Sequence, residues 1–184
     1  VSIAIGFFFL QSPSTSNDIA PNLVYSTKVG EQKSVALADG STVLMNTDSR
    51  IRVEYGTALR EVHLLQGEAY FEVAHNRDRP FLVHAGKNIV RAVGTAFSVH
   101  VRERVVDVVV TEGAVELSSV ANMNGRASAR TLRAPQVTKL AALTAGQSAT
   151  FSQGVDFIQT IQAPEVARRL SWREGVLSFS GEPL

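Results

Sequence analysis

The chain has 184 residues, and its 18 basic and 17 acidic side chains give a formal net charge of only +1 at pH 7. This length suits one ordinary domain, or one domain with a fragment of another. The near balance of charge argues against a nucleic-acid-binding surface. Cysteine is absent, which excludes a disulfide framework and thiolate metal sites.

The first ten residues, "VSIAIGFFFL", are apolar and uncharged. They are too few to cross a bilayer core, which needs about 20 residues. Because the chain begins with Val1 rather than Met, we expect it to be part of a longer protein. Two interpretations fit residues 1–10: a buried strand or helix, or the end of a membrane helix. The polar, serine-rich sequence that follows is typical of a juxtamembrane linker over residues 11–30.

From about Glu31 to Leu117, apolar residues recur at every second position. The clearest runs cover residues 51–55, 69–73, 81–85, 97–101 and 106–110. This period predicts half-buried strands, with polar residues such as His84 and His100 facing solvent. Asp39-Gly40 predicts a tight hairpin. Short strands at this spacing predict an all-β fold, either a rolled antiparallel β-sandwich or a solenoid-like sheet.

Three glycines each precede an alternating run, in "QGEAYFEV" (66–73), "EGAVELSS" (112–119) and "AGQSATFS" (145–152). This weak repetition predicts strands that enter a rolled sheet at equivalent corners. Residues 120–140 lose the pattern and are expected to form a surface loop, with the sheet resuming near Leu143–Phe151. Residues 153–170 are predicted to be a linker and a short helix, because Pro164 is well placed to open a helix.

The sequence contains no common catalytic motif: neither a nucleophile elbow, nor a Walker loop, nor a dinucleotide fingerprint. His63, His75, His84 and His100 lack the helical spacing of a zinc protease and are expected to face solvent. A cupin-like metal site assembled across strands is the alternative. Glu68 and Glu72 share one strand face with Tyr70, about 13 Å apart. Paired glycosidase carboxylates lie roughly 5 to 10 Å apart, so this face is predicted to be solvated. We therefore expect no metal and no cofactor.

Five short motifs follow one another in order. They are Asp39-Gly40-Ser41 with Leu44 and Asn46 after it, the Gly67–Val73 run, Arg79-Pro80-Phe81, Val93-Gly94-Thr95-x-Phe97, and Glu112-Gly113. Over residues 35–117, about half of the chain, their order and spacing together resemble the FecR family of bacterial sigma-factor regulators. Each motif alone is weak evidence.

The resemblance implies a single-pass inner-membrane protein. Its cytoplasmic segment, which would precede Val1, would hold an extracytoplasmic-function sigma factor. Its periplasmic part would receive a signal from the signalling domain of an outer-membrane TonB-dependent transducer, often one for iron or siderophore uptake. Residues 1–10 would then be the end of the transmembrane helix and residues 31–152 the FecR-like β domain. Residues 171–184 are similar to the start of the short domain shared by secretins and TonB-dependent transducers.

Some members of the family are cut at a Gly-Thr bond equivalent to Gly94–Thr95. The Thr95 hydroxyl could attack the Gly94 carbonyl, and water would hydrolyse the resulting ester. His84 or Glu112 could supply the base. The opposing interpretation is that Gly94–Thr95 is only a corner of the sheet.

We therefore expect a non-enzymatic signal-receiving module, self-cleavage apart, whose partners add to a strand edge rather than fill a pocket. Alternatives are a carbohydrate-binding or cupin-like β-module of the cell envelope, or an envelope scaffold domain.

Overall fold

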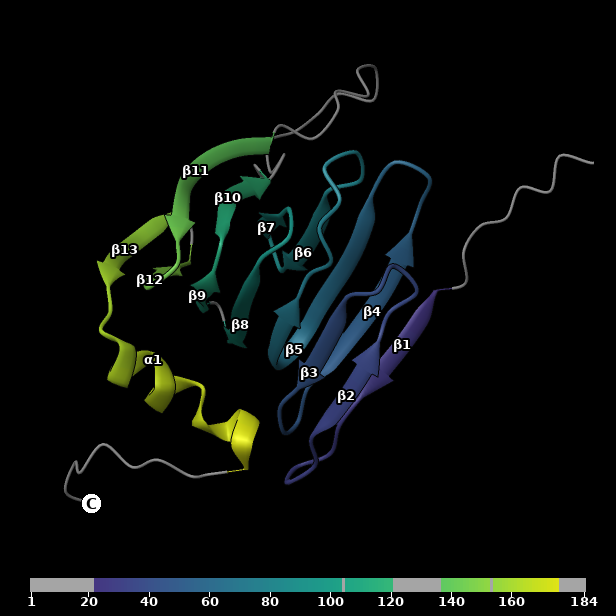
Figure 1. The fold of residues 1–184 in the computed structure, drawn as a ribbon, viewed down its shortest axis with the longest axis horizontal. Helices are drawn as coiled ribbons and strands as arrows, with labels where there is room; N and C mark the ends of the chain where they lie inside the picture. Colours follow the sequence, from purple (N-terminus) through teal and green to yellow (C-terminus); the bar gives the residue numbers. More distant parts are fainter. Residues whose placement is uncertain (1–21, 104, 121–136, 153, 176–184) are drawn as a thin grey trace, which may run out of the picture.

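The computed structural model describes residues 22–103, 105–120, 137–152 and 154–175, which contain thirteen strands, one α-helix and one 3-10 helix. This confirms the prediction of an all-β fold with a short helix near the C-terminus (Figure 1). The strands are β1 (Leu23–Ser26), β2 (Lys33–Ala36), β3 (Thr42–Met45), β4 (Arg50–Tyr55), β5 (Arg60–Glu72), β6 (Phe81–Ala85), β7 (Asn88–Ala92), β8 (Ala96–Arg102), β9 (Val105–Glu112), β10 (Ala114–Val120), β11 (Val137–Thr144), β12 (Gln147–Phe151) and β13 (Val155–Thr160). The helices are α1 (Ala163–Arg169) and η1 (Ser171–Glu174).

The strands form two layers that share β5. In the first layer the order is β1-β4-β5-β6-β7-β10-β11, and in the second it is β2-β3-β5-β8-β9-β12-β13. The first half of β5 pairs with β4 and β6, and its second half pairs with β3 and β8. All pairings are antiparallel except β5 with β6, which is parallel. The rolled sandwich predicted from the sequence therefore has one parallel pairing that the hairpin pattern does not reveal.

Glycines mark the corners where strands enter the sheet. At Gly67, where β5 passes from one layer to the other, φ is +79°, and an added Cβ would lie 2.3 Å from Ser49 Oγ. Gly113 and Gly146 also have positive φ, at +73° and +79°. The three glycines of the repeated pattern thus adopt the same left-handed conformation, which glycine tolerates best.

The core lies between the layers and consists of the inward members of each alternating run. Phe71, Phe81 and Phe97 are fully buried at its centre. The Phe71 ring stacks on Phe97 at a centroid distance of 5.3 Å and meets Phe81 edge-on at 6.1 Å. The period-two prediction of the buried face is confirmed for these strands, because inward residues such as Ile51, Val83 and Val108 are also buried.

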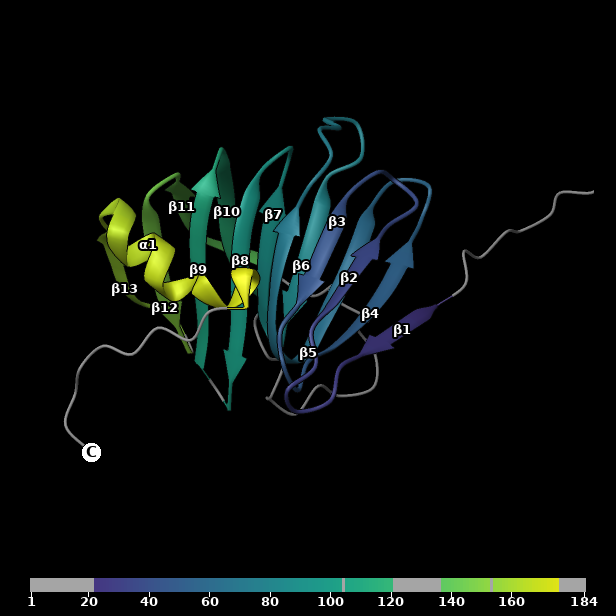
Figure 2. The same cartoon turned by 60° about the horizontal axis from the view of Figure 1, so that its bottom comes forward.

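The α1–η1 segment (Ala163–Glu174) crosses the outer face of the second layer (Figure 2). Pro164 occupies the first turn of α1, as the sequence predicts. Leu170 and Trp172 are buried against Tyr70, with Leu44 and Ala96 beside them. The prediction of a solvated Glu68–Tyr70–Glu72 face is therefore wrong at Tyr70, which is only 5% exposed because this later segment covers it.

The structure differs from the sequence-based boundaries in three places. β1 lies within the predicted linker over residues 11–30, and β13 lies within the predicted linker after residue 152. β11 begins at Val137, before the expected resumption of the sheet near Leu143. β1 and β13 lie at the ends of their layers, where only one neighbour stabilises them, and their large apolar residues are partly exposed.

Residues 1–10, expected to be the end of a transmembrane helix, lie outside the described residues, as do residues 176–184 of the predicted C-terminal domain. Among the helices that the structure describes, none is long and apolar enough to span a membrane.

Candidate functional site

Two of the sequence motifs, the Asp39 turn and Arg79-Pro80-Phe81, meet at one buried cation, Arg60. Its side chain is 1% exposed and donates from Nη1 to Asp39 Oδ2 at 2.6 Å and to the Ala74 carbonyl at 3.0 Å. Its Nε donates to the Arg79 carbonyl at 2.7 Å. Arg60 therefore fixes the Asp39 turn and the 74–79 loop at one end of the sandwich.

Asp39 is the anionic partner in this cluster. Burial alone would raise the pKa of Asp39, but hydrogen bonds from Ser41, Arg60 and Tyr55 together hold it below its ordinary value. Burial and the Asp39 carboxylate raise the pKa of Tyr55, so its hydroxyl stays protonated and donates to Asp39 Oδ1 at 2.8 Å. The Arg60–Asp39 pair is thus fully hydrogen-bonded, as a buried ion pair must be.

Gly94 lies beside this cluster, in the bend between β7 and β8. Its φ is +73°, and an added Cβ would lie 2.5 Å from Nδ1 and 2.9 Å from Cβ of His75. The position therefore requires glycine for two reasons, the backbone conformation and the imidazole packed against it. The sheet corner predicted at Gly94–Thr95 is present.

Thr95 is 5% exposed, and its carbonyl accepts a hydrogen bond from the Val73 amide at 2.9 Å. Its Oγ1 is buried without a hydrogen-bond partner among the described residues. From the other side, the glycine at 113 approaches so closely that an added Cβ there would lie 2.8 Å from Thr95 Cγ2 and 3.2 Å from the Gly94 carbonyl oxygen. A buried hydroxyl without a partner is uncommon, because leaving it unpaired is costly.

A cavity of about 450 Å³, here called the Thr95 cavity, opens over this peptide bond. Its lining includes Thr95, His75, Glu72 and Glu112. Glu112, named from the sequence as a candidate base, is therefore at the site. His84 is not: it pairs with Ile89 in the first layer and stacks on His63 at a ring-centroid distance of 4.5 Å.

A chain of contacts links the α1–η1 segment to the residue after Thr95. The Arg173 guanidinium lies 3.7 Å from the centroid of the Tyr70 ring. The Tyr70 hydroxyl is hydrogen-bonded to Thr111 Oγ1 at 2.8 Å, and Thr111 Oγ1 donates to the Ala96 carbonyl at 2.9 Å. Since Ala96 directly follows Thr95, the docked segment supports the backbone at the site.

The structure disperses the four histidines. His63 and His84 lie together on the first layer, His75 lies at Gly94, and His100 lies beneath α1. Within the part of the chain that the structure describes, no group of three or more His, Asp or Glu side chains is arranged to hold a metal ion. The expectation of solvent-facing histidines is wrong for His63, His84 and His100, which are all partly buried, His100 in a cavity.

Sequence reasoning singled out Gly94, Thr95 and Glu112, missed Arg60, and named His75 only among the four histidines and not as a neighbour of Gly94. Arg60 begins β5 with an ordinary alternating pattern, and only its complete burial distinguishes it. His75 lies in a loop between two motifs, and a contact with Gly94 cannot be read from spacing. The adjacent Arg79-Pro80-Phe81 motif was the one signal that this loop has a fixed conformation.

Comparisons with known proteins identify similar folds and a family. Two crystal structures of a candidate anti-sigma factor from Parabacteroides distasonis ATCC 8503, at 2.50 and 1.65 Å resolution, share the fold, each with a TM-score of 0.67 and 24% sequence identity. The matches cover 89% and 88% of this chain, and 70% and 69% of those chains. No curated protein matches the chain. The family model described as FecR protein matches residues 24–116, which include every motif gathered around Arg60 and Gly94. The chain therefore belongs to the FecR family.

Proposed function

We propose that this chain is the periplasmic signal-receiving part of a transmembrane sigma-factor regulator. The observation that carries the proposal is the FecR family match over residues 24–116. The shared fold with a candidate anti-sigma factor supports it. In this proposal the protein is a single-pass inner-membrane protein, and it relays the state of an outer-membrane TonB-dependent transducer, such as one for iron or siderophore uptake, to a cytoplasmic sigma factor.

The experiment uses the full-length natural protein that contains this chain. A reporter gene under the sigma factor's promoter is compared in cells with the intact gene, without it, and with Arg60→Met in the described domain. Because Arg60 organises the domain, we expect this variant to lose the response to the transducer's ligand while the protein remains in the membrane. A reporter that responds equally in all three strains would contradict the proposal.

Docking of the transducer is tested separately. The purified signalling domain of the transducer should retain the periplasmic part of the natural protein in a pull-down. A free strand edge is the expected contact, since β1, β2, β11 and β13 each end a sheet path among the described strands. If no co-encoded signalling domain binds, the transducer is excluded as the partner. The sigma-factor role is then still tested by the reporter experiment.

A second candidate function, self-cleavage at Gly94–Thr95, is favoured by one specific observation. The Thr95 hydroxyl is buried and unpaired next to a glycine peptide with φ of +73°. Thr95 Oγ1 would attack the Gly94 carbonyl carbon, the Gly94–Thr95 C–N bond would break, and the hydroxyl proton would pass to the Thr95 nitrogen. Water would then hydrolyse the ester, leaving a carboxylate on Gly94 and a free amine and hydroxyl on Thr95.

His75 and Glu112 are the side chains that could move the proton, because both line the Thr95 cavity. Intact-mass measurement of the purified protein should show two fragments divided at this bond. Thr95→Ala should give one mass, whereas Thr95→Ser, which keeps the hydroxyl, should still be cut. A single mass in the wild type after long incubation would exclude self-cleavage without affecting the regulatory proposal.

A further inference from the structure

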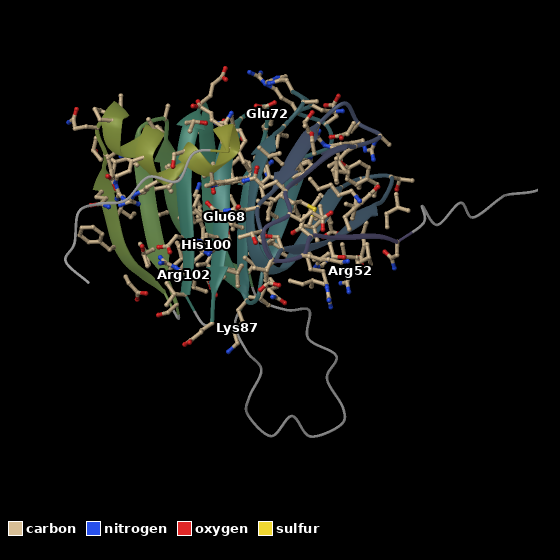
Figure 3. All side chains as sticks on the ribbon, turned by 90° about the horizontal axis from the view of Figure 1, so that it is seen from below. Arg52, Glu68, Glu72, Lys87, His100 and Arg102 are labelled. Atoms are coloured by element: carbon tan, nitrogen blue, oxygen red, sulfur yellow. The ribbon has the colours of Figure 1, made fainter. Side chains whose placement is uncertain are left out.

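A second cavity, here called the α1 cavity, lies between the outer face of the second layer and the α1–η1 segment. Its volume is about 580 Å³, larger than the Thr95 cavity. Side chains of β5, β8, β9 and β12 form its floor, and Arg169 and Trp172 belong to its roof. Figure 3 shows two floor residues, Glu68 and His100, on neighbouring strands, with Arg102 beyond them.

The floor carries two fixed carboxylates on either side of His100. Glu68 pairs with His100 across β5 and β8, and His100 pairs with Asp107 across β8 and β9. Glu68 accepts hydrogen bonds from Asn46 at 2.9 Å and Ser98 at 3.0 Å. A carboxylate can accept about four hydrogen bonds, so Glu68 is held in place and still has lone pairs free for a ligand.

Asp107 is held in the same way. Thr150 Oγ1 donates to one of its oxygens at 2.6 Å, and Arg102 contacts the other. Burial lowers the pKa of His100, although Glu68 opposes this effect, so at neutral pH the imidazole between the two carboxylates is uncharged. Arg102 contacts Asp107 from the rim of the cavity, with its own side chain 61% exposed.

The roof presents hydrogen-bond donors instead. The Arg169 Nε donates to Glu165 at 2.7 Å, and its Nη1 lies 3.4 Å from Ser148 Oγ. Trp172 is 9% exposed, and its indole Nε1 is buried with no acceptor among the described residues. This nitrogen has almost no accessible surface, so the Trp172 ring borders the cavity without presenting its N–H to it.

The two sides of the cavity are therefore complementary to groups of opposite charge. The floor accepts hydrogen bonds from a cation, and the roof donates hydrogen bonds to an anion or carbonyl. From this complementarity we propose that the α1 cavity binds a small zwitterion with an ammonium and a carboxylate group, such as a free amino acid or a short peptide. The ammonium lies on Glu68 and Asp107, and the carboxylate accepts from the Arg169 guanidinium. This site goes beyond the regulatory function proposed above and does not depend on it.

The single tryptophan of the chain gives a direct readout. The indole N–H resonance of Trp172 and its fluorescence are followed while amino acids are added one at a time, with the dipeptide Ala-Ala as a separate arm. At least one zwitterion should shift the signal saturably, and the arm that binds more tightly distinguishes a free amino acid from a peptide. Propionate, ethylamine and glycerol, which each lack at least one charge, should bind at least tenfold more weakly.

Variants test the assignment of the two ends. Glu68→Gln and Asp107→Asn should each weaken zwitterion binding at least tenfold, and Arg169→Gln should do the same. Glu116→Gln is the matched control, because Glu116 contacts Arg91 and Lys139 on the other layer. Thermal unfolding confirms that each variant is folded. The proposal is overturned if no zwitterion gives a saturable shift, if propionate or glycerol binds equally well, or if folded floor variants bind like the wild type.

Discussion

Arg60 illustrates how a buried charge can organise a domain at the scale of one residue. Its guanidinium contacts the Asp39 carboxylate and backbone carbonyls, and it also lies 5.4 Å from the centroid of the Phe81 ring. Taking an ion pair out of water is costly, and the cost is offset only when the remaining hydrogen bonds are satisfied. The value of this pair lies in fixing the Asp39 turn relative to the 74–79 loop.

Truncating Arg60 should therefore be severe. We expect Arg60→Ala to lower the free energy of unfolding by about 3 to 5 kcal/mol, because it leaves the Asp39 charge buried without its partner. Arg91→Ala is the control: Arg91 forms an ion pair with Glu116 in which both side chains are about 40% exposed. Such exposed pairs contribute about 0 to 1 kcal/mol. Denaturant unfolding measures both, and similar losses would contradict the assigned role of Arg60.

Gly94 gives a second prediction at this scale. Gly94→Ala should destabilise the domain by about 2 to 4 kcal/mol, through the left-handed backbone and the collision with His75. Gly86→Ala has a comparable φ of +63° but nothing within 4 Å of the added Cβ, so it should cost only about 1 to 2 kcal/mol. Equal losses in denaturant unfolding would show that the His75 contact adds nothing.

At the scale of elements, α1 is held to the sheet mainly by the residues at and beyond its C-terminal end. It has no buried residue, and its attachment depends on Leu170 and on Trp172 of η1. The Trp172 carbonyl also accepts a hydrogen bond from Gln32 Nε2 at 2.7 Å. The segment is thus anchored at its C-terminal end, whereas its first turn borders a cavity.

Removing the anchor should release the whole segment. We expect Trp172→Ala to raise amide hydrogen exchange throughout Ala163–Glu174 and at Ala96, while the core strands keep their protection because their hydrophobic cluster is separate. Phe157→Ala on β13 is the control, since that ring is 56% exposed. Hydrogen exchange measured by mass spectrometry would contradict this account if α1 stayed protected in the Trp172 variant.

The strands could be predicted well from the sequence, and their covering could not. Period-two alternation identifies the inward face of runs such as 69–73 and 97–101, because that face is buried whatever the topology. The outward face is different: Tyr70 and His100 are covered by a segment that lies about 100 and about 70 residues later in the chain, respectively. The parallel β5–β6 pairing and the contact of His75 with Gly94 likewise depend on tertiary structure. For the site, the sequence indicated the Gly94–Thr95 junction through the motif, but it could not identify what surrounds it.

For the whole molecule, β5 is the strand on which both layers depend. Its thirteen residues carry Arg60 at one end and Tyr70 and Glu72 at the other, so the core, the Thr95 cavity and the α1 cavity share one continuous strand. A rigid shared strand can couple two sites, provided that an element packed against it has two discrete arrangements. Hydrogen exchange in the Trp172 variant tests whether the α1–η1 segment, docked on β5 through Tyr70, has a second, released arrangement.

The whole-molecule stability should fall on mild acidification. Burial lowers the pKa of His63, with the neighbouring His84 adding to the effect, and burial also lowers the pKa of His100. A histidine whose pKa is lower in the folded state binds protons more readily once unfolded. Its contribution to stability is therefore complete above its ordinary pKa of 6.5 and declines as the pH falls below that value.

Carboxylates face both rings and oppose the lowering of the histidine pKa: Glu54 and Glu61 at His63, and Glu68 and Asp107 at His100. The effect of burial is larger, so the pKa of each histidine is still lowered. We expect the denaturant midpoint to decrease between about pH 7 and pH 5, since this is the range over which a histidine titrates. The double variant His63→Asn with His100→Asn should have a smaller decrease over that range. Below it, protonation of Asp39, whose pKa is also lowered, should remove further stability in both proteins. A midpoint that stays constant or rises on acidification in the wild type would show that the two half-buried imidazoles do not control this part of the curve.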